Sequence, residues 1–354
     1  MAANTFRSIN KNQLGWHSDM GGDVLEWLHM DGWMDNGYYY NSTLASKLDM
    51  AENAVGSEKK DWPIVALLIT SPEGEIKQVY KAFPAEEFKA EPWGVTIGNN
   101  VFKGLLTPDG LPAGYQVKLD IDDVGIDITA KAICTGVRFV EDEHGYVYYD
   151  PTTNTGAGWW PLVPRASVEG TITFQGKKTK KTAGLGYCER QLGNRQGWKM
   201  NEWISHWFWG HFWAGDYTAI WTYAAGSEML QYRPFSPLVL WKGSDIILCT
   251  NNLSLSPDKF ELDDVTGCAY PTIETIHATQ GNIELLGLVQ PPKLSERYQM
   301  FNLPGQTLEN AGCCFRGVSD IDVEITRLDR LEQMRGKCMY EHGQITRWIP
   351  VPRK

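Results

Sequence analysis

The most aromatic part of the sequence is residues 203–223, which read WISHWFWGHFWAGDYTAIWTY. Because side chains alternate between the two faces of a β-strand, Trp207, Trp209 and His211 share one face of the predicted strand. Phe208 and Phe212 occupy the other face, so both faces are apolar, as is typical of a strand buried on both sides. Ala-Gly-Asp at 214–216 predicts a tight turn into a second strand at 217–223.

Further strands are predicted on either side of this pair. Short runs of β-branched, aromatic or alternating residues recur between Gly, Pro, Asn and Asp clusters. The predicted strands are 37–45, 63–70, 76–83, 115–124, 125–140, 166–174, 207–213, 217–223, 238–249, 272–279, 283–289 and 319–328. Spacing of about 10 residues is typical of all-β sandwiches and barrels. Helices are expected only at 84–88, as a single turn, and at 329–337.

The length and composition allow either one or two domains. A chain of 354 residues with 42% hydrophobic residues supports one large core or two ordinary ones. The stretch GSEMLQYRPFSP at 226–237 follows the aromatic strands and is a plausible break. We therefore expect an all-β protein with two antiparallel domains, residues 1–230 and 231–354. The basic run KKTKK at 177–181 is expected at a solvated hairpin tip.

The charge balance narrows the class of partner. The chain carries 33 Lys and Arg against 43 Asp and Glu, a formal net charge of −10. A nucleic-acid-binding protein would need a basic face for phosphates, so nucleic acid is not an expected partner, and anionic membranes are disfavoured for the same reason. No apolar run approaches the roughly 20 residues of a membrane-spanning helix. The first residues lack the pattern of a secretory signal, so we expect a cytoplasmic protein.

Several cofactor and metal motifs are missing from the sequence. The seven cysteines contain no Cys-x-x-Cys pair, which favours buried free thiols over a disulfide framework, and the two glycosylation sequons are then chance matches. No His-x-His or His-x-x-x-His pair indicates a metal site. No Gly-x-Gly-x-x-Gly or P-loop indicates a nucleotide cofactor, and no Gly-x-Ser-x-Gly indicates a serine nucleophile. We expect neither a cofactor nor a metal.

Two segments carry groups capable of chemistry. The first is GLGYCERQLGNR at 184–195, in which the adjacent Glu189 and Arg190 point to opposite faces of a strand. A buried charge must be paired, so whichever of the two faces inward either forms an ion pair or binds a ligand. The second segment is EWLHMDGWMD at 26–35, where Asn36-Gly37 predicts a hairpin turn. His211 is open to two interpretations, a hydrogen-bonded core histidine or a donor in a pocket.

These segments resemble one protein family. The sequence EWLHMDG at 26–32 is similar to the Glu-Trp-Trp-Tyr-Phe-Asp-Gly-like opening of carotenoid 1,2-hydratases and AttH-like lipocalin-type proteins. The sequence GLGYCERQLG at 184–193 is similar to their Gly-x-Gly-Tyr-x-(Asp/Glu)-His-(Asn/Gln)-Trp-Gly-like centre. Further similar runs lie at 92–100, 159–166 and 336–342. Within the family, the chain most resembles fungal lipocalin-like Diels-Alderases, and Arg190 in place of the family's His weighs against hydration.

The resemblance implies an N-terminal sandwich-like domain and a C-terminal lipocalin-like barrel that enclose a substrate cavity. It also implies a cofactor-independent pericyclase of secondary metabolism, either a Diels-Alderase or a hetero-Diels-Alderase. Such an enzyme would cyclise a polyene or quinone-methide intermediate, a hydrophobic polyketide or terpenoid. Two alternatives remain: an isoprenoid hydratase or isomerase, and a non-catalytic carrier of a hydrophobic ligand.

A cycloaddition requires reacting ends held in one pose and donors that stabilise developing charge. The candidate donors are Arg190, His211 and Tyr187, and Glu189 is the candidate for orienting a donor or removing a proton. The candidate substrate-binding residues are Trp27, Tyr39, Gln191, Trp207, Trp209, Trp221 and Tyr223.

Overall fold

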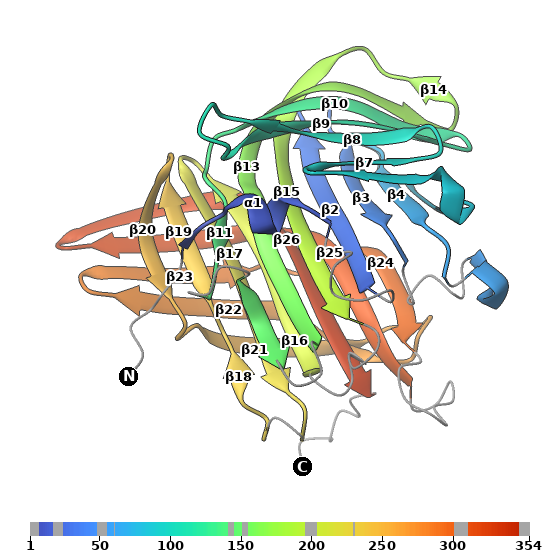
Figure 1. Cartoon of the computed structure of the whole chain (residues 1–354). Coiled ribbons are helices and arrows are strands. Elements are labelled where there is room, and N and C mark those ends of the chain that lie inside the picture. The colour runs from blue at the N-terminus through green and yellow to red at the C-terminus, as the bar shows by residue number, and fades with distance from the viewer. Residues whose placement is uncertain are drawn as a thin grey trace. The chain divides into compact units, whose positions relative to one another are not determined.

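The computed structural model describes residues 7–16, 24–47, 55–59, 61–140, 145–150, 155–194, 204–228, 231–300 and 311–346 (Figure 1). Within these residues the only helices are α1 (Lys11–Leu14), single 3-10 turns at Ser57–Lys59 and Ala85–Glu87, and isolated helical residues at positions 55 and 228. All the strand pairs that they form are antiparallel. The all-β class and the single turn near 84–88 are therefore confirmed. The described part of the chain has no helix with the length and apolarity that a membrane crossing requires.

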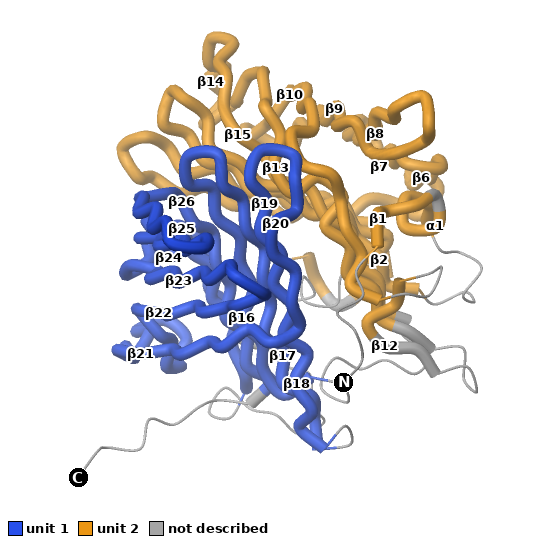
Figure 2. The backbone as a smooth tube through the Cα atoms, turned by 90° about the vertical axis from the view of Figure 1, so that its left-hand side faces the viewer, with its two compact units in different colours: residues 1–4, 199–354 blue, residues 5–198 orange. Residues whose placement is uncertain are grey.

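The chain forms two compact units (Figure 2): unit 2 comprises residues 5–198, and unit 1 comprises residues 1–4 and 199–354. The sequence predicts the boundary at residue 230. The structure instead pairs β17 (Tyr217–Gly226) with β19 (Leu238–Lys242) in one sheet, which places the aromatic strands in unit 1. A boundary at residue 230 would cut this sheet.

Unit 2 is built on one long antiparallel sheet. Its strands are β1 (Arg7–Ser8), β2 (Val24–Met34), β3 (Tyr39–Ala45), β4 (Ile64–Thr70), β5 (Ile76–Ala82), β6 (Phe88–Glu91), β7 (Gly94–Ile97), β8 (Asn100–Leu106), β9 (Pro112–Ile121), β10 (Val124–Ala132), β11 (Val137–Arg138), β12 (Tyr146–Asp150), β13 (Thr155–Phe174), β14 (Lys177–Lys178) and β15 (Thr182–Asn194). The long sheet runs β5-β4-β3-β2-β15-β13-β10-β9-β8-β7-β6, with β12 and β14 paired to β13, whereas β1 and β11 form a separate two-stranded sheet. As predicted, Asn36-Gly37 turns β2 into β3, and the exposed lysines lie at a hairpin.

The sheet of unit 2 curls around its own core. In Figure 1, β7–β10 run across the upper ends of β2 and β15. The hydroxyl of Tyr115 on β9 donates to the carbonyl of Tyr187 on β15, at 3.1 Å. A Cβ at Gly186 would lie 2.8 Å from the Tyr115 hydroxyl and 3.0 Å from the Tyr40 hydroxyl, so this close approach requires glycine. The enclosed core is mainly Ile, Val and Leu, with Tyr40 and Trp160.

Unit 1 is a second curled sheet. Its strands are β16 (Ile204–Ala214), β17, β18 (Pro234–Phe235), β19, β20 (Asp245–Thr250), β21 (Ser254–Leu262), β22 (Ala269–Gln280), β23 (Ile283–Val289), β24 (Lys293–Met300), β25 (Ala311–Arg327) and β26 (Arg330–Thr346). The main order is β20-β19-β17-β16-β26-β25-β23-β22-β21. The backbone N–H of Cys249 on β20 donates to Oε1 of Gln280 on β22 at 2.7 Å, which links strands from opposite ends of this order.

Two predictions in unit 1 are wrong. The expected helix at 329–337 is the turn and first half of β26, because β26 pairs with β25 along its whole length and this ladder outweighs local helix propensity. The strand predicted at 238–249 is two strands, β19 and β20, separated by a turn at Gly243, which has a φ of +60°.

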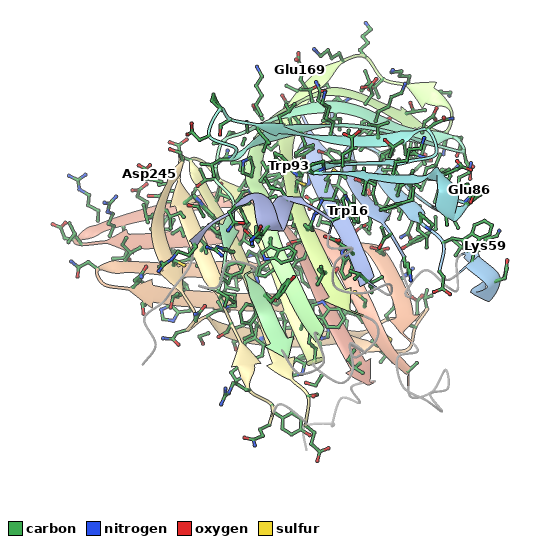
Figure 3. All side chains as sticks on the ribbon, in the orientation of Figure 1. Trp16, Lys59, Glu86, Trp93, Glu169 and Asp245 are labelled. Carbon is green, nitrogen blue, oxygen red and sulfur yellow. A yellow bond between two sulfur atoms is a disulfide. The ribbon has the colours of Figure 1, made fainter. Side chains whose placement is uncertain are left out.

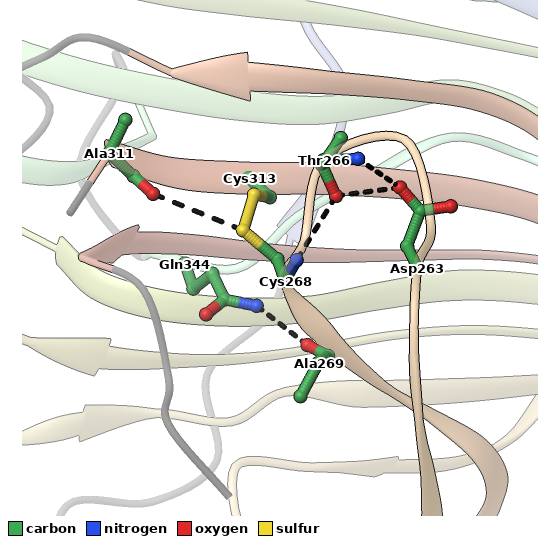
Figure 4. Close-up of a disulfide and its surroundings, with 7 residues drawn as sticks. All are labelled: Asp263, Thr266, Cys268, Ala269, Ala311, Cys313 and Gln344. Carbon is green, nitrogen blue, oxygen red and sulfur yellow. Dashed lines mark hydrogen bonds between the residues drawn. A yellow bond between two sulfur atoms is a disulfide. The ribbon is translucent and has the colours of Figure 1, made fainter. Parts of the chain in front are cut away.

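The expectation that all cysteines are free is also wrong. Cys268, just before β22, and Cys313 on β25 form a disulfide across a sequence separation of 45 (Figure 4). Spacing in the sequence did not reveal this pair because the sheet, rather than a local motif, brings the two residues together. The other five cysteines are buried thiols, as predicted.

Candidate functional site

The two segments singled out in the sequence pair with each other in unit 2. Strand β15 lies beside β2 near the middle of the sheet, with Tyr187 opposite Asp31, Glu189 opposite His29, and Gln191 opposite Trp27. These six side chains project from the same face, because directly opposed residues share a face. We call this surface, together with Trp159 of the neighbouring β13, the Glu189 face. The opposite face of β15 and β2 forms the core of unit 2.

Glu189 is the centre of a hydrogen-bond cluster on this face. Its Oε2 accepts from the Tyr187 hydroxyl at 2.6 Å and from the indole Nε1 of Trp159 at 2.5 Å. Its Oε1 accepts from Nε2 of Gln191 at 2.5 Å. Two carboxylate oxygens offer about four lone-pair sites, so three donors leave room for one more partner. The cluster fixes the carboxyl group and leaves it able to bind or receive a proton.

Burial controls the protonation of this cluster. Burial raises the pKa of Glu189, although the nearby His29 and the three donors act in the opposite direction. Burial, reinforced by the charge of Glu189, raises the pKa of Tyr187 well above its usual value, so Tyr187 stays a donor. Nε2 of His29 lies 3.4 Å from Oδ2 of Asp31, and both side chains are buried. A carboxyl group with a raised pKa beside a His–Asp pair is suited to general acid–base chemistry.

Arg190 lies on the opposite face, in the core of unit 2. Its side chain is 0% exposed, and its guanidinium lies 3.3 Å from the Glu26 carboxylate. It also donates to the Gly15 carbonyl and stacks on Trp16, with 4.8 Å from the guanidinium carbon to the ring centroid. Of the two roles that the sequence left open, the structure therefore shows the ion pair. Arg190 is not brought together with Glu189.

The aromatic residues predicted to bind substrate lie in different units and on different faces of the sheets. Trp27 and Tyr39 lie on the face of unit 2 that carries Glu189, since Tyr39 is paired with Trp33 and their ring centroids are 5.0 Å apart. Trp207 and Trp209 lie on one face of β16 in unit 1. Within this unit, Nε1 of Trp207 donates to Oε1 of Glu341 at 2.7 Å.

The other predicted residues of unit 1 lie on both faces of its sheet. His211 is fully buried on the same face as Trp209, with its ring centroid 6.0 Å from that of Trp209 and 5.0 Å from that of Trp213. Trp221 and Tyr223 are paired with Gly210 and Phe208, so they lie on the opposite face. Trp221 belongs to the unit 1 core, and Tyr223 packs against that core. These two residues do not share a wall with Trp207 and Trp209.

Three residues of the Glu189 face were not predicted as site residues. His29 and Asp31 lie inside the quoted 26–32 motif, and Trp159 begins the 159–166 run. The available signal was period-two alternation, which places His29 and Asp31 on the same face as Trp27. Among the described residues, no three His, Cys, Asp or Glu side chains group as a metal site would require.

Comparison with solved structures defines the fold class: the chain has the all-β, lipocalin-like fold of AttH-like proteins. An AttH-type protein from Nitrosomonas europaea is 16% identical, with a TM-score of 0.63 over 96% of this chain and 98% of that one. Kievitone hydratase from Nectria haematococca is 14% identical, with a TM-score of 0.59 over 95% and 93%. CghA is 10% identical, with a TM-score of 0.58 over 93% and 90%. At these identities the likeness establishes the fold alone.

CghA has also been solved with Sch210972 bound. No family model and no curated protein matches the sequence.

Proposed function

We propose that this protein is a cofactor-independent pericyclase, a Diels-Alderase or hetero-Diels-Alderase of secondary metabolism. Its substrate would be a polyene or quinone-methide intermediate, a hydrophobic polyketide or terpenoid. The observation that carries the proposal is the buried Glu189 carboxyl, held by three donors on a face that also presents Trp27 and Trp159. The sequence resemblance and the lipocalin-like fold support the same function.

A pericyclic reaction requires positioning more than covalent chemistry. Aromatic rings such as Trp27 and Trp159 would hold a polyene with its reacting ends close together, and the gain in effective concentration would supply much of the acceleration. Tyr187 and Trp159 keep the Glu189 carboxyl in one orientation. The remaining lone pair of that carboxyl would orient a hydroxyl or enol of the substrate.

The hetero-Diels-Alder variant uses the same residues as acid and base. Glu189 would remove the phenolic proton of an o-hydroxybenzyl alcohol, while His29 gives a proton to the benzylic hydroxyl, which leaves as water. An alkene then adds to the resulting o-quinone methide, and one C–C and one C–O bond form. Transfer of the proton from Glu189 back to His29 restores both groups.

A hydratase is the second candidate, and one observation favours it. The His29–Asp31 pair next to Glu189 is an acid–base arrangement that would equally serve the addition of water to an alkene. A carrier would need the aromatic surface but not these ionisable groups. The fungal origin and cytoplasmic location expected from the sequence remain predictions.

The decisive experiment compares products. The purified protein is incubated with a chelator and an extract from a host that accumulates the linear precursor, and the products are resolved by mass and by chiral chromatography. One stereoisomer of unchanged mass, or of mass reduced by one water, supports the pericyclase. A product heavier by one water supports the hydratase, and an unchanged bound ligand supports the carrier.

Matched variants connect the reaction to the site. Glu189→Gln should abolish or strongly reduce turnover, because the amide can neither remove a proton nor keep the same donors. Glu169→Gln is the control, since Glu169 lies on the neighbouring strand β13 (Figure 3). Its side chain is 62% exposed and forms an ion pair with Lys181. Equal turnover in the two variants would refute the assignment of Glu189.

A further inference from the structure

The chain contains two N-glycosylation sequons, and the structure places them in opposite environments. The first, NST at 41–43, lies within β3, where Asn41 is 4% exposed and its side-chain nitrogen Nδ2 is buried. The second, NLS at 252–254, lies between β20 and the start of β21, and both Asn252 and Ser254 are exposed. A sequon is modified at Nδ2 of its asparagine, so the folded protein must hold that atom at the surface. The second sequon meets this requirement and the first does not.

The loop that carries Asn252 is fixed by its neighbours, while the Asn252 side chain is exposed. The backbone N–H of Asn252 donates to Oγ1 of Thr250 at 3.1 Å, and the backbone N–H of Leu253 donates to the Ser236 carbonyl at 3.1 Å. Leu253 is 5% exposed and belongs to the core of unit 1. Within the part of the chain that the structure describes, the Asn252 side chain makes no hydrogen bond. A group attached to its Nδ2 would therefore displace no contact.

The environment of Asn41 is the opposite. Asn41 is paired with Asp31 on β2 and with Leu68 on β4. Directly opposed residues share a face, so Asn41 lies on the Glu189 face. An oligosaccharide on its buried Nδ2 would require the groups that cover this atom to move apart, so a chain modified here could not keep the observed packing.

The disulfide of unit 1 indicates the compartment in which the chain folds. Disulfides such as Cys268–Cys313 form and persist in oxidising compartments, and the secretory pathway, where N-glycosylation takes place, is one of these. The two sequons were interpreted as chance matches because all cysteines were expected to be free, and the disulfide removes that reason. The five free thiols are all buried, and buried thiols are inert, so an oxidising compartment would leave them intact.

We propose that Asn252 is an N-glycosylation site and that the chain folds in the secretory pathway, in place of the cytoplasmic location expected from the sequence. In the transfer, Nδ2 of Asn252 forms a bond to the anomeric carbon of a lipid-linked oligosaccharide diphosphate. The bond from that carbon to the diphosphate oxygen breaks, and one amide proton is released with the lipid diphosphate. This site lies in unit 1 and does not depend on the function proposed above.

The test is expression of the full chain in yeast behind a cleavable secretion signal. The secreted protein is treated with peptide N-glycosidase F in heavy-oxygen water, which converts each glycosylated asparagine to labelled aspartate, and its peptides are mapped by mass spectrometry. We expect the label at Asn252 and none at Asn41. Asn252→Gln and Ser254→Ala should each remove the glycan, because the transfer requires both the amide and the hydroxyl. Asn251→Gln is the matched control, because this exposed neighbour lies outside the sequon and its replacement should leave the glycan in place.

A count of reactive thiols tests the compartment. Alkylation of the denatured protein should modify five cysteines in the secreted chain and all seven in chain made in a reducing bacterial cytosol. The cytosolic protein should unfold at a lower temperature, because it lacks the Cys268–Cys313 bond. An unmodified Asn252 in the folded, secreted protein, a label at Asn41, or seven reactive thiols in the secreted protein would each overturn the proposal. Failure of the wild-type chain to fold and leave the cell would also overturn it.

Discussion

Replacing Arg190 tests whether this residue stabilises the fold or takes part in the chemistry. In Arg190→Met, the buried Glu26 carboxylate loses its ion-pair partner, a loss that costs about 3–5 kcal/mol in other proteins. The Gly15 carbonyl also loses a donor, which adds about 1 kcal/mol. We therefore expect the free energy of unfolding of unit 2 to fall by roughly 4–6 kcal/mol.

The double variant Arg190→Met/Glu26→Leu should recover most of this loss. Replacing both members of a buried ion pair with apolar residues of similar size is often close to neutral, so the double variant should lie within about 2 kcal/mol of the wild type. Urea unfolding followed by tryptophan fluorescence measures the free energy of unfolding of the wild type, of the single variants Arg190→Met and Glu26→Leu, and of the double variant. Arg335→Met is the control, because Arg335 forms an exposed ion pair with Asp320 and should contribute little.

The turnover of the double variant tests whether Arg190 acts only through the fold. If Arg190 acts only through the fold, the double variant should keep the activity of the wild type under conditions where both are folded. A double variant that is folded but inactive would show that the guanidinium contributes to the chemistry. Wild-type stability in Arg190→Met would contradict the ion-pair argument itself.

Three further predictions concern stability and pH. Cys268→Ser/Cys313→Ser should lower the free energy of unfolding of unit 1 by up to about 4 kcal/mol, because the bond closes a loop of 45 residues, and thermal unfolding with and without reductant measures it. Tyr187→Phe removes a donor that lowers the pKa of Glu189, so the acidic limb of the pH–rate profile should move to higher pH, and an unmoved limb would exclude Glu189 as the titrating group. The pKa of the buried Glu274 on β22 is about 8 in the fold against 4.5 for the free group, so the folded protein holds this proton more tightly than the unfolded chain does. The stability gained from this proton is therefore fully present below pH 4.5 and is lost as the pH rises to 8. Wild type should therefore lose stability relative to Glu274→Gln over that range, and a difference independent of pH would contradict the burial of this group.

The parts of the fold that follow from local pattern were predictable. The Asn36-Gly37 hairpin and the turn at 214–216 follow from turn chemistry, and the aromatic strand follows from alternation. The same turn could have corrected the prediction that Trp221 shares a surface with Trp209. Once Ala214 lies opposite Tyr217, the register pairs Trp221 with Gly210, and both lie on the opposite face of the sheet from Trp209.

The candidate site depended on pairing between distant segments. That Glu189 and Arg190 face opposite ways follows from the sequence, but which of them lies in the core depends on the curl of the sheet in unit 2. His29 could be placed beside Glu189 only once β2 was known to pair with β15, and these two strands are far apart in the chain. The Cys268–Cys313 bond has the same origin, and none of these contacts leaves a local signal.

The alternation of Glu189 and Arg190 also limits how the gene can vary in length. Deleting or inserting one residue in β15 ahead of this pair, with the rest of the ladder kept, would exchange the two side chains between faces. A carboxylate would then lie beside the Glu26 carboxylate, and a guanidinium beside His29. The spacing from the β13–β15 hairpin to residue 189 is thus constrained as tightly as the identity of either residue, and insertions and deletions in homologues of this chain should accumulate at strand ends rather than within β15.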